Sequence, residues 1–136
     1  MSARVLIVED NRDNMALMDY LLTAAGYVPL LAAGGALGVR AAAEVPPDLI
    51  LLDIQMPEMD GYEVAGAIRA DPAMAHTKLV AVTAFAMVGD QERIIAAGFD
   101  GYLTKPISPE TFVRDVEQFL APEQRVSAAS AVRARR

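Results

Sequence analysis

Four short apolar runs in this sequence each end on polar residues that could take part in chemistry. The residues at these ends are Glu9 with Asp10, Asp53, Thr83 and Lys105. If the runs are buried parallel strands, their carboxyl ends meet at one edge of one sheet. Packing alone has little use for such a set, because clustered carboxylates repel one another. The pattern therefore predicts a site that binds a metal ion and handles phosphate.

The acidic residues after the first and third runs are the candidates for metal ligands. Neighbouring strands lie about 4.8 Å apart, so Asp10 and Asp53 should nearly touch. Two close carboxylates need a compensating cation. Mg²⁺ is the natural choice, because it prefers oxygen ligands and shares them among carboxylates, water and phosphate. Glu9 adds a third acid, which we expect to act through water.

The groups after the last two runs could stabilise a transferring phosphoryl group. The ammonium of Lys105 would neutralise one carboxylate and then contact an anion, and the hydroxyl of Thr83 could donate a hydrogen bond. Ala84 is small and would leave an opening beside it. A metal ion, an ammonium and a hydroxyl around a carboxylate are suited to phosphoryl transfer. Asp53 has the position of the nucleophile.

Strand and helix patterns alternate along the chain. Strands are expected at 4–9, 28–32, 49–52, 78–82 and 101–104, and helices at 11–25, 34–44, 61–70, 88–97 and 109–120. Pro29 suits an edge strand, and Pro109 suits the first turn of the last helix. The pattern predicts an α/β fold, a flavodoxin-like doubly wound sheet of five parallel strands with five helices. The common strand order for such a sheet, 2-1-3-4-5, places the first and third strands side by side where ligands bind.

Composition indicates one compact domain. The 136 residues are 54% hydrophobic and include no cysteine, which excludes disulfides and cysteine-based zinc sites. No apolar stretch is long enough to span a membrane, and the start of the chain leaves no room for a signal peptide. A cytoplasmic protein is the expectation.

Charge divides the chain into two parts. Residues 1–121 carry 8 basic and 17 acidic side chains, a net charge of −9, whereas residues 122–136 carry 4 basic and 1 acidic, a net charge of +3. An acidic body is a poor binder of nucleic acid. We expect residues 1–121 to form the domain and 122–136 a flexible basic tail. Its Arg-Ala-Arg-Arg ending is either a basic docking arm, a solubilising tail or the start of a linker.

Five short motifs together resemble the receiver domain of two-component response regulators. They are Val-Glu-Asp-Asn at 8–11, Leu-Asp-Ile-Gln-Met-Pro at 52–57, Asp-Gly at 60–61, Val-Thr-Ala at 82–84 and Lys-Pro-Ile at 105–107. The resemblance covers about residues 3–120, and the order and spacing of the motifs are highly specific. Residues 82–87 and 54–55 are most similar to stand-alone DivK-type regulators and to receivers fused to hybrid kinases.

The resemblance implies a role for each matching residue. Asp53 would accept a phosphoryl group from a phosphohistidine on a sensor histidine kinase or a histidine phosphotransfer protein. The main-chain carbonyl of Gln55 would join Glu9, Asp10 and Asp53 in holding Mg²⁺. Thr83 and Lys105 would contact the phosphoryl oxygens.

The same resemblance implies how phosphate becomes a signal. Thr83 would move toward the phosphoryl group with the loop at 84–88, and Tyr102 would turn inward as the family's aromatic switch. The surface of the helix at 88–97, the strand at 101–104 and the last helix would then bind a downstream protein differently. Tyr102 as an ordinary strand residue stays an alternative, since aromatic residues are common in strands. The bond before Pro106 is expected to be cis, as in the family.

Other functions make different demands on the sequence. The expected protein is a switch and not an enzyme, with catalysis limited to phosphoryl transfer and hydrolysis at its own aspartate. An aspartyl-phosphate phosphatase would need an acid at Gln55, and a flavodoxin-like FMN carrier would need a phosphate loop where Asp10 lies. No DNA-binding module is visible. The chain could also be the receiver fragment of a larger regulator or hybrid kinase. His76 is expected at the surface.

Overall fold

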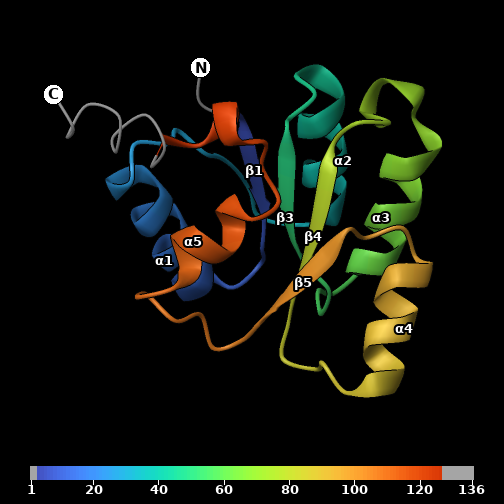
Figure 1. The fold of residues 1–136 in the computed structure, drawn as a ribbon. Coiled ribbons are helices and arrows are strands. Elements are labelled where there is room, and N and C mark those ends of the chain that lie inside the picture. Colours follow the sequence, from blue (N-terminus) through green and yellow to red (C-terminus); the bar gives the residue numbers. More distant parts are fainter. Residues whose placement is uncertain (1–2, 127–136) are drawn as a thin grey trace, which may run out of the picture.

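Five parallel strands form one sheet at the centre of the molecule (Figure 1). The computed structural model describes residues 3–126. The strands are β1 (Val5–Val8), β2 (Leu30–Ala32), β3 (Leu49–Asp53), β4 (Lys78–Thr83) and β5 (Gly101–Thr104). Their order, β2-β1-β3-β4-β5, confirms the predicted topology and places β1 beside β3.

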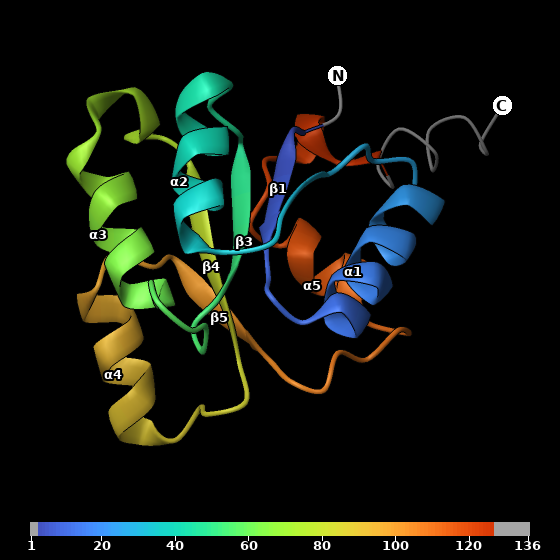
Figure 2. The ribbon, with the colours of Figure 1, turned by 180° about the vertical axis from the view of Figure 1, so that it is seen from behind.

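Helices cover both faces of the sheet. They are α1 (Arg12–Ala24), α2 (Gly35–Glu44), α3 (Gly61–Ala70), α4 (Val88–Ala96) and α5 (Phe112–Glu117). Helices α1 and α5 lie on one face, and α2, α3 and α4 lie on the other, as opposite views show (Figures 1 and 2). Two short 3-10 helices, η1 (Pro72–Met74) and η2 (Pro122–Gln124), complete the described elements.

The core is divided by the sheet into two apolar clusters. Successive residues of a strand point to opposite faces, so Leu6 of β1 joins the cluster under α2 and α3, and Ile7 joins the cluster under α1 and α5. Both side chains are fully buried. Burial on both faces explains why the strands appear in the sequence as continuous apolar runs without alternation.

The helix that follows β1 begins and ends at residues suited to those positions. Asn11 caps α1, because its side-chain oxygen accepts a hydrogen bond from Asn14 N at 2.9 Å. Gly26, just past the helix, has φ of +105°, a conformation that glycine adopts without strain. These residues fix the length of α1 and thus the place of the loop after β1.

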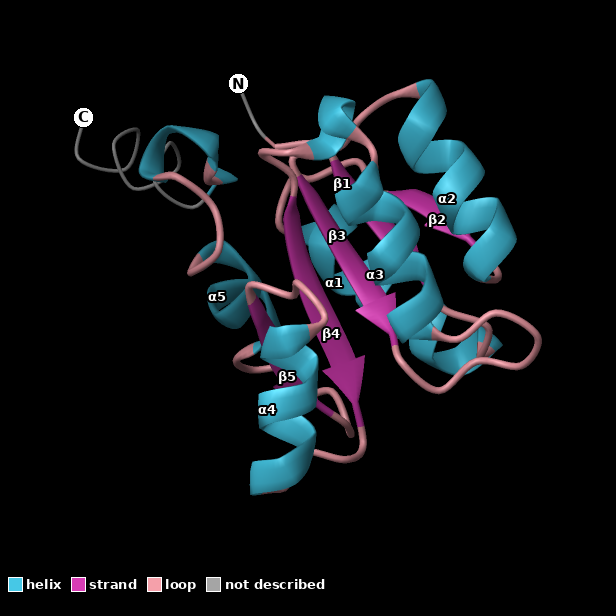
Figure 3. Cartoon of the chain, turned by 90° about the vertical axis from the view of Figure 1, so that its right-hand side faces the viewer, coloured by secondary structure: helices cyan, strands magenta, loops and turns pink. Residues whose placement is uncertain are grey.

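The second strand is shorter than predicted and lies at the edge of the sheet (Figure 3). It begins at Leu30, directly after Pro29, and pairs only with β1 among the described strands. A proline has no N–H to donate to a ladder, which explains why the strand does not include Val28 and Pro29.

The last helix is also shorter than predicted, and its predicted start at Pro109 is wrong. Helix α5 covers six residues, and tighter turns flank it. Thr111 N bonds to Ser108 O at 3.2 Å, three residues back instead of four, and Phe119 N bonds to Val116 O in the same way at 3.0 Å. The turns continue the apolar spacing of a helix beyond the α-helix itself, which is why the sequence pattern predicted a longer one.

Residues 122–126, the first part of the predicted basic tail, lie in the described structure. Gln124 O accepts a hydrogen bond from Ala3 N at 3.1 Å, so this segment lies against the start of the chain. The rest of the predicted tail, residues 127–136, lies outside the described residues. Within residues 3–126, no helix combines the length and the apolar character needed to cross a membrane.

Candidate functional site

The carboxyl ends of four adjacent strands meet at one edge of the sheet. Glu9 follows β1, Asp53 ends β3, Thr83 ends β4 and Lys105 follows β5. Because the strands are parallel, these ends lie along the same edge, and the last residue of each strand or the residue after it places its polar side chain in one region. A cleft at this edge is lined by Asp10, Asp53, Gln55, Lys105 and the first turn of α1.

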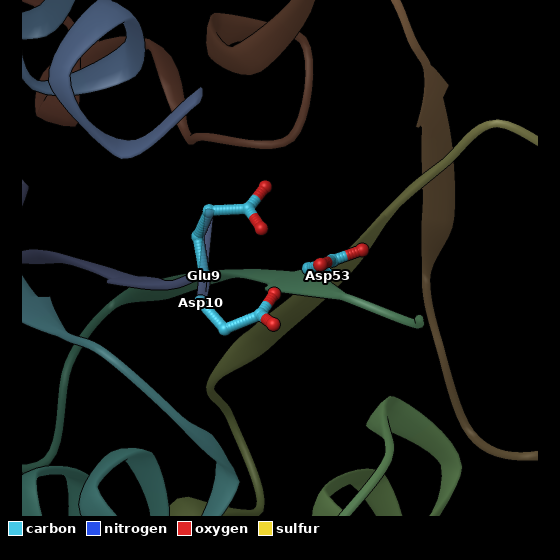
Figure 4. Close-up of side chains that lie close together, drawn as sticks. All are labelled: Glu9, Asp10 and Asp53. Carbon is cyan, nitrogen blue, oxygen red and sulfur yellow. The ribbon is translucent and has the colours of Figure 1, made fainter. Parts of the chain in front are cut away.

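Three carboxylates gather at the ends of β1 and β3. Each of Glu9, Asp10 and Asp53 places one carboxylate oxygen within 4.8 Å of the others. Glu9 and Asp10 leave opposite sides of the end of β1, and Asp53 lies beside them (Figure 4). Glu9 and Asp53 are only 1% and 2% exposed, whereas Asp10 is exposed. Two buried acids this close to a third require positive charge nearby.

Lys105 supplies part of that positive charge. Its Nζ lies 3.1 Å from Asp53 Oδ1 and 3.1 Å from Glu9 Oε1. Its backbone N donates to Thr83 O at 2.8 Å, which continues the ladder just beyond β5 and fixes the start of the side chain. Burial lowers the pKa of Lys105, but the two carboxylates outweigh burial and raise that pKa above its ordinary value. The side chain is therefore a cation at neutral pH.

The single ammonium of Lys105 does not neutralise the three carboxylates of Glu9, Asp10 and Asp53. Burial and the neighbouring Asp53 raise the pKa of Glu9 to about 7, although Asn11 N and Lys105 act in the opposite direction. Glu9 Oε1 has the ion pair with Lys105 but no well-aligned hydrogen bond within residues 3–126. A buried oxygen without a hydrogen bond, in a group made only of oxygen ligands, fits a hard divalent cation such as Mg²⁺.

Backbone amides orient two of the carboxylates. Asn11 N donates to Glu9 Oε2 at 3.2 Å, and Gln55 N donates to Asp53 Oδ1 at 3.1 Å. The start of α3 supports the loop after Asp53, since Gly61 N bonds to Ile54 O at 3.0 Å. Gly61 packs so closely that a Cβ there would lie 2.6 Å from Ile54 Cα. The backbone that carries the Asp53 carboxylate is thus packed closely against the start of α3.

The hydroxyl of Thr83 forms hydrogen bonds with the loop that follows β4. It accepts a hydrogen bond from Phe85 N at 2.9 Å and donates toward Phe85 O at 3.2 Å. Gln55 Nε2 also donates to it at 3.2 Å. No hydrogen bond joins this hydroxyl to Asp53 in the described part of the chain. Contact with a group on Asp53 would therefore require Thr83 to give up these partners.

The link between Gln55 and Thr83 was not anticipated from the sequence. The prediction concerned only the main-chain carbonyl of Gln55, as a metal ligand. The side chain of Gln55 joins the loop after β3 to the last residue of β4, across 28 positions of the chain. No local pattern signals such a contact, because it depends on how the loop after β3 faces the end of β4.

The remaining predicted positions lie on or after β5 and on the surface. Tyr102 is half-buried and packs at the border of the cluster that also holds Phe99. The peptide bond between Lys105 and Pro106 is cis, as expected. His76 is exposed.

Comparisons with known proteins match nearly the whole domain. A family model described as "Response regulator receiver domain" matches residues 5–117. The polar-differentiation response regulator DivK of Brucella ovis is 43% identical over 120 residues, which is 88% of this chain and 98% of that protein. The DivK of Brucella anthropi has the same identity and coverage.

Solved structures agree with this result. Chemotaxis protein CheY4 of Vibrio cholerae superposes with a TM-score of 0.84 at 29% identity, covering 88% of this chain and 100% of that one. The receiver domain of a sensor histidine kinase from Pseudomonas aeruginosa, solved with a magnesium ion coordinated in its active site cleft, gives a TM-score of 0.79 at 34% identity. That match covers 88% of this chain and 98% of that one.

Proposed function

Because this chain belongs to the response regulator receiver domain family, whose members are phosphorylation-dependent signalling switches of two-component systems, we propose that Asp53 accepts the phosphoryl group. The place of Asp53 carries this proposal. It is a buried carboxylate at the end of β3, 3.1 Å from the Lys105 ammonium and beside Glu9 and Asp10. A carboxylate positioned in this way can act as a nucleophile.

The donor we propose is a phosphohistidine on a sensor histidine kinase or a histidine phosphotransfer protein. An oxygen of Asp53 attacks phosphorus, the new O–P bond forms, and the N–P bond breaks. The histidine nitrogen keeps the bonding electrons and takes up a proton. The Lys105 ammonium, which pairs with the Asp53 carboxylate, would then stabilise the negative charge on the phosphoryl oxygens. Water later cleaves the O–P bond, which returns Asp53 and phosphate.

The acidic group would hold Mg²⁺ through Glu9, Asp10 and Asp53, together with the main-chain carbonyl of Gln55. When bound, Mg²⁺ supplies charge neutralisation for the phosphoryl oxygens. The Pseudomonas aeruginosa receiver domain, which carries magnesium in its cleft, supports the same choice of ion here.

Thr83 would carry the signal away from Asp53. A phosphoryl group adds about −1.5 to −2 charges and three strong acceptors, which would draw the Thr83 hydroxyl from Phe85 and Gln55. The loop before α4 would follow, and Tyr102 would turn inward. The α4-β5-α5 face would then bind its partner differently, with a coupling of about 1–3 kcal/mol.

The output we propose is contact with a downstream protein. The acidic body is unsuited to direct binding of nucleic acid. Receiver domains are signalling switches and not dedicated enzymes, which sets aside the phosphatase and FMN-carrier alternatives. The relatives include stand-alone regulators and a receiver of a sensor kinase, and the same switch would serve in either setting.

Phosphorylation by a small donor tests the core of the proposal. The protein is incubated with Mg²⁺ and acetyl phosphate, or with a phosphorylated kinase, and its intact mass is measured. We expect the mass of one phosphoryl group to be added, and Asp53→Asn to abolish that gain. Asp115→Asn, an equal change of charge on α5, is the control and should be labelled normally. Absence of labelling by both donors would refute the assignment of Asp53.

A further inference from the structure

A long uncharged segment, residues 20–39, interrupts the charged surface of the protein. It contains no Asp, Glu, Lys, Arg or His, although charged residues make up 22% of the chain and 20 residues would on average hold about four. The segment runs from the last turns of α1 through β2 into the first half of α2. It holds five of the ten large apolar side chains that are exposed within residues 3–126: Tyr20, Val28, Leu30, Leu31 and Leu37. Exposed apolar side chains without charges among them are typical of the centre of a protein interface.

Strand β2, in the middle of this segment, is an edge of the sheet formed by the described strands (Figure 3). Glu9 N donates to Ala32 O at 3.1 Å, so the main-chain groups of Ala32 point toward β1. Because successive residues of a strand alternate in direction, the N–H and C=O of Leu31 point toward the open edge. Natural proteins often block such an edge with charged side chains, and β2 has none. Leu31 can therefore pair with another strand.

Apolar side chains flank this edge on both faces of the sheet. Leu30 is level with Leu6, whose side chain packs on the side of α2 and α3. Leu31 is level with Ile7, whose side chain packs on the side of α1 and α5. Leu30 is 44% exposed and Leu31 is 48% exposed. A helix laid on one face would cover only one of these leucines, whereas a strand added in the plane of the sheet would cover both.

Charge favours a second copy of this chain as the source of that strand. Residues 1–121 carry a net charge of −9, so two copies repel each other wherever their acidic surfaces meet. At the uncharged segment, no charge of one copy would face a like charge of the other. A basic partner would gain most from binding where acidic side chains lie, and this segment offers it none.

We propose that two copies of the chain form a dimer by antiparallel pairing of their β2 strands about a two-fold axis at Leu31. The N–H of each Leu31 then donates to the C=O of Leu31 in the other copy, so the same atoms serve on both sides. Pro29 has no N–H to donate and β2 ends at Ala32, so the paired strands are short. The dimer is accordingly weak and reversible, in the class of small transient interfaces. Strand β5 lies at the opposite edge of the sheet, so the α4-β5-α5 face of each copy stays free.

Sedimentation of the full chain between about 10 μM and about 1 mM tests the dimer. We expect the mass of a monomer at the lowest concentration and a rise toward twice that mass at the highest. Leu31→Lys should abolish the rise, because two ammonium groups would meet at the axis. Val28→Lys, at a position that is 85% exposed, should weaken the dimer without any change in the core. The mass of a monomer at every concentration of the wild type would overturn the proposal.

Ile95→Lys is the matched control for these two variants. Its side chain is 55% exposed on α4, outside the uncharged segment. Each added lysine lowers the net negative charge, so general repulsion between copies falls equally in all three variants. Ile95→Lys should therefore form the dimer at least as well as the wild type. A dimer that is lost in Ile95→Lys and kept in Leu31→Lys would place the contact on α4 and overturn the proposal.

Amide hydrogen exchange tests the pairing of the strands. Exchange at the N–H of Leu31 should slow as the protein concentration rises, because that N–H becomes bonded in the dimer. The N–H of Ala32, on the side of β1, is the internal reference and should change less. A dimer without slower exchange at Leu31 would overturn the pairing of the edges.

Salt distinguishes this dimer from one held by ion pairs. Salt screens the repulsion between two acidic copies, so the dissociation constant should fall by about threefold between about 50 mM and about 500 mM NaCl. A contact made by ion pairs would weaken instead. Weaker association at high salt would therefore overturn the assignment of the interface to the uncharged segment.

Discussion

The protonation of Glu9 links the cleft to the stability of the metal-free protein. Its pKa is about 7 in the folded protein and 4.5 in the unfolded chain. Between these pH values the folded state binds more protons, so raising the pH should lower the free energy of unfolding, by at most about 3 kcal/mol. The measurement is urea unfolding in EDTA at pH 5, 6 and 7.

The Glu9→Gln variant is the control for this pH dependence. An amide cannot titrate, so the decline between pH 5 and 7 should flatten. If the variant keeps the slope of the wild type, the decline belongs to other groups and Glu9 is not the buried acid that titrates.

Thr83 should separate phosphorylation from its consequences. Thr83→Ala removes the hydroxyl that bonds to Phe85 and Gln55 but leaves Asp53 and Lys105 in place. We expect the variant to be phosphorylated on Asp53 while the amide shifts of Phe85 and Tyr102 on phosphorylation shrink. The measurement is an NMR spectrum before and after addition of acetyl phosphate with Mg²⁺.

Thr83→Ser retains the hydroxyl and provides the matched comparison. Its shifts on phosphorylation should approach those of the wild type. Full wild-type shifts in Thr83→Ala would instead show that the loop moves without this side chain.

Among the elements, the start of α3 packs most closely against the backbone of Asp53, the proposed phosphoryl acceptor. At Gly61, a Cβ would meet backbone on the loop after Asp53, at 2.6 Å from Ile54 Cα and 2.7 Å from Asp53 O. We expect Gly61→Ala to lower the free energy of unfolding by about 1–3 kcal/mol, because backbone cannot swing aside. The same shift should slow phosphorylation of Asp53. Urea unfolding and labelling by acetyl phosphate measure the two effects.

Gly66, in the same helix, is the control for this substitution. Nothing lies within 4 Å of a Cβ built there, and the residue is exposed. Gly66→Ala should stabilise the protein by roughly 0.5–1 kcal/mol, because alanine favours the helix. Equal effects at both positions would mean that the contact of Gly61 with the loop does not matter.

Elements were predictable where one strong pattern specifies them. The buried strand ending at Asp53 is a continuous apolar run, and α3 begins at Gly61 after a capping box formed by Asp60 and Glu63. The ends of α5 could not be predicted in this way. The flanking turns have hydrogen bonds from residue i to residue i−3, and their apolar residues keep nearly the same spacing as in an α-helix.

The polar residues of the site could be predicted as types, because each directly follows an apolar strand. Their contacts could not. The bond between Gln55 and Thr83 depends on side-chain directions in the loop after β3 and at the end of β4, and the raised pKa of Glu9 depends on how deeply that carboxylate is buried. Both are results of packing that no spacing in the chain encodes.

At the scale of the whole molecule, the carboxylates that would bind a metal ion also lower the stability of the metal-free protein. Three carboxylates lie close together and the Lys105 ammonium pairs with two of them, so the folded protein without metal carries unfavourable repulsion. Asp53→Asn removes one of these charges but also one of the proposed metal ligands. We therefore expect the variant to be more stable than the wild type in EDTA, by about 1 kcal/mol, and to gain less on addition of Mg²⁺.

Thermal or urea unfolding in EDTA and in excess Mg²⁺ measures both differences. A ligand at 100 times its dissociation constant stabilises the folded state by about 2.7 kcal/mol, so a gain of that order is within reach for the wild type. Asp115→Asn removes an equal charge from α5 and should follow the wild type in both conditions. If Asp53→Asn gains as much stability from Mg²⁺ as the wild type, Asp53 is not a ligand of the ion.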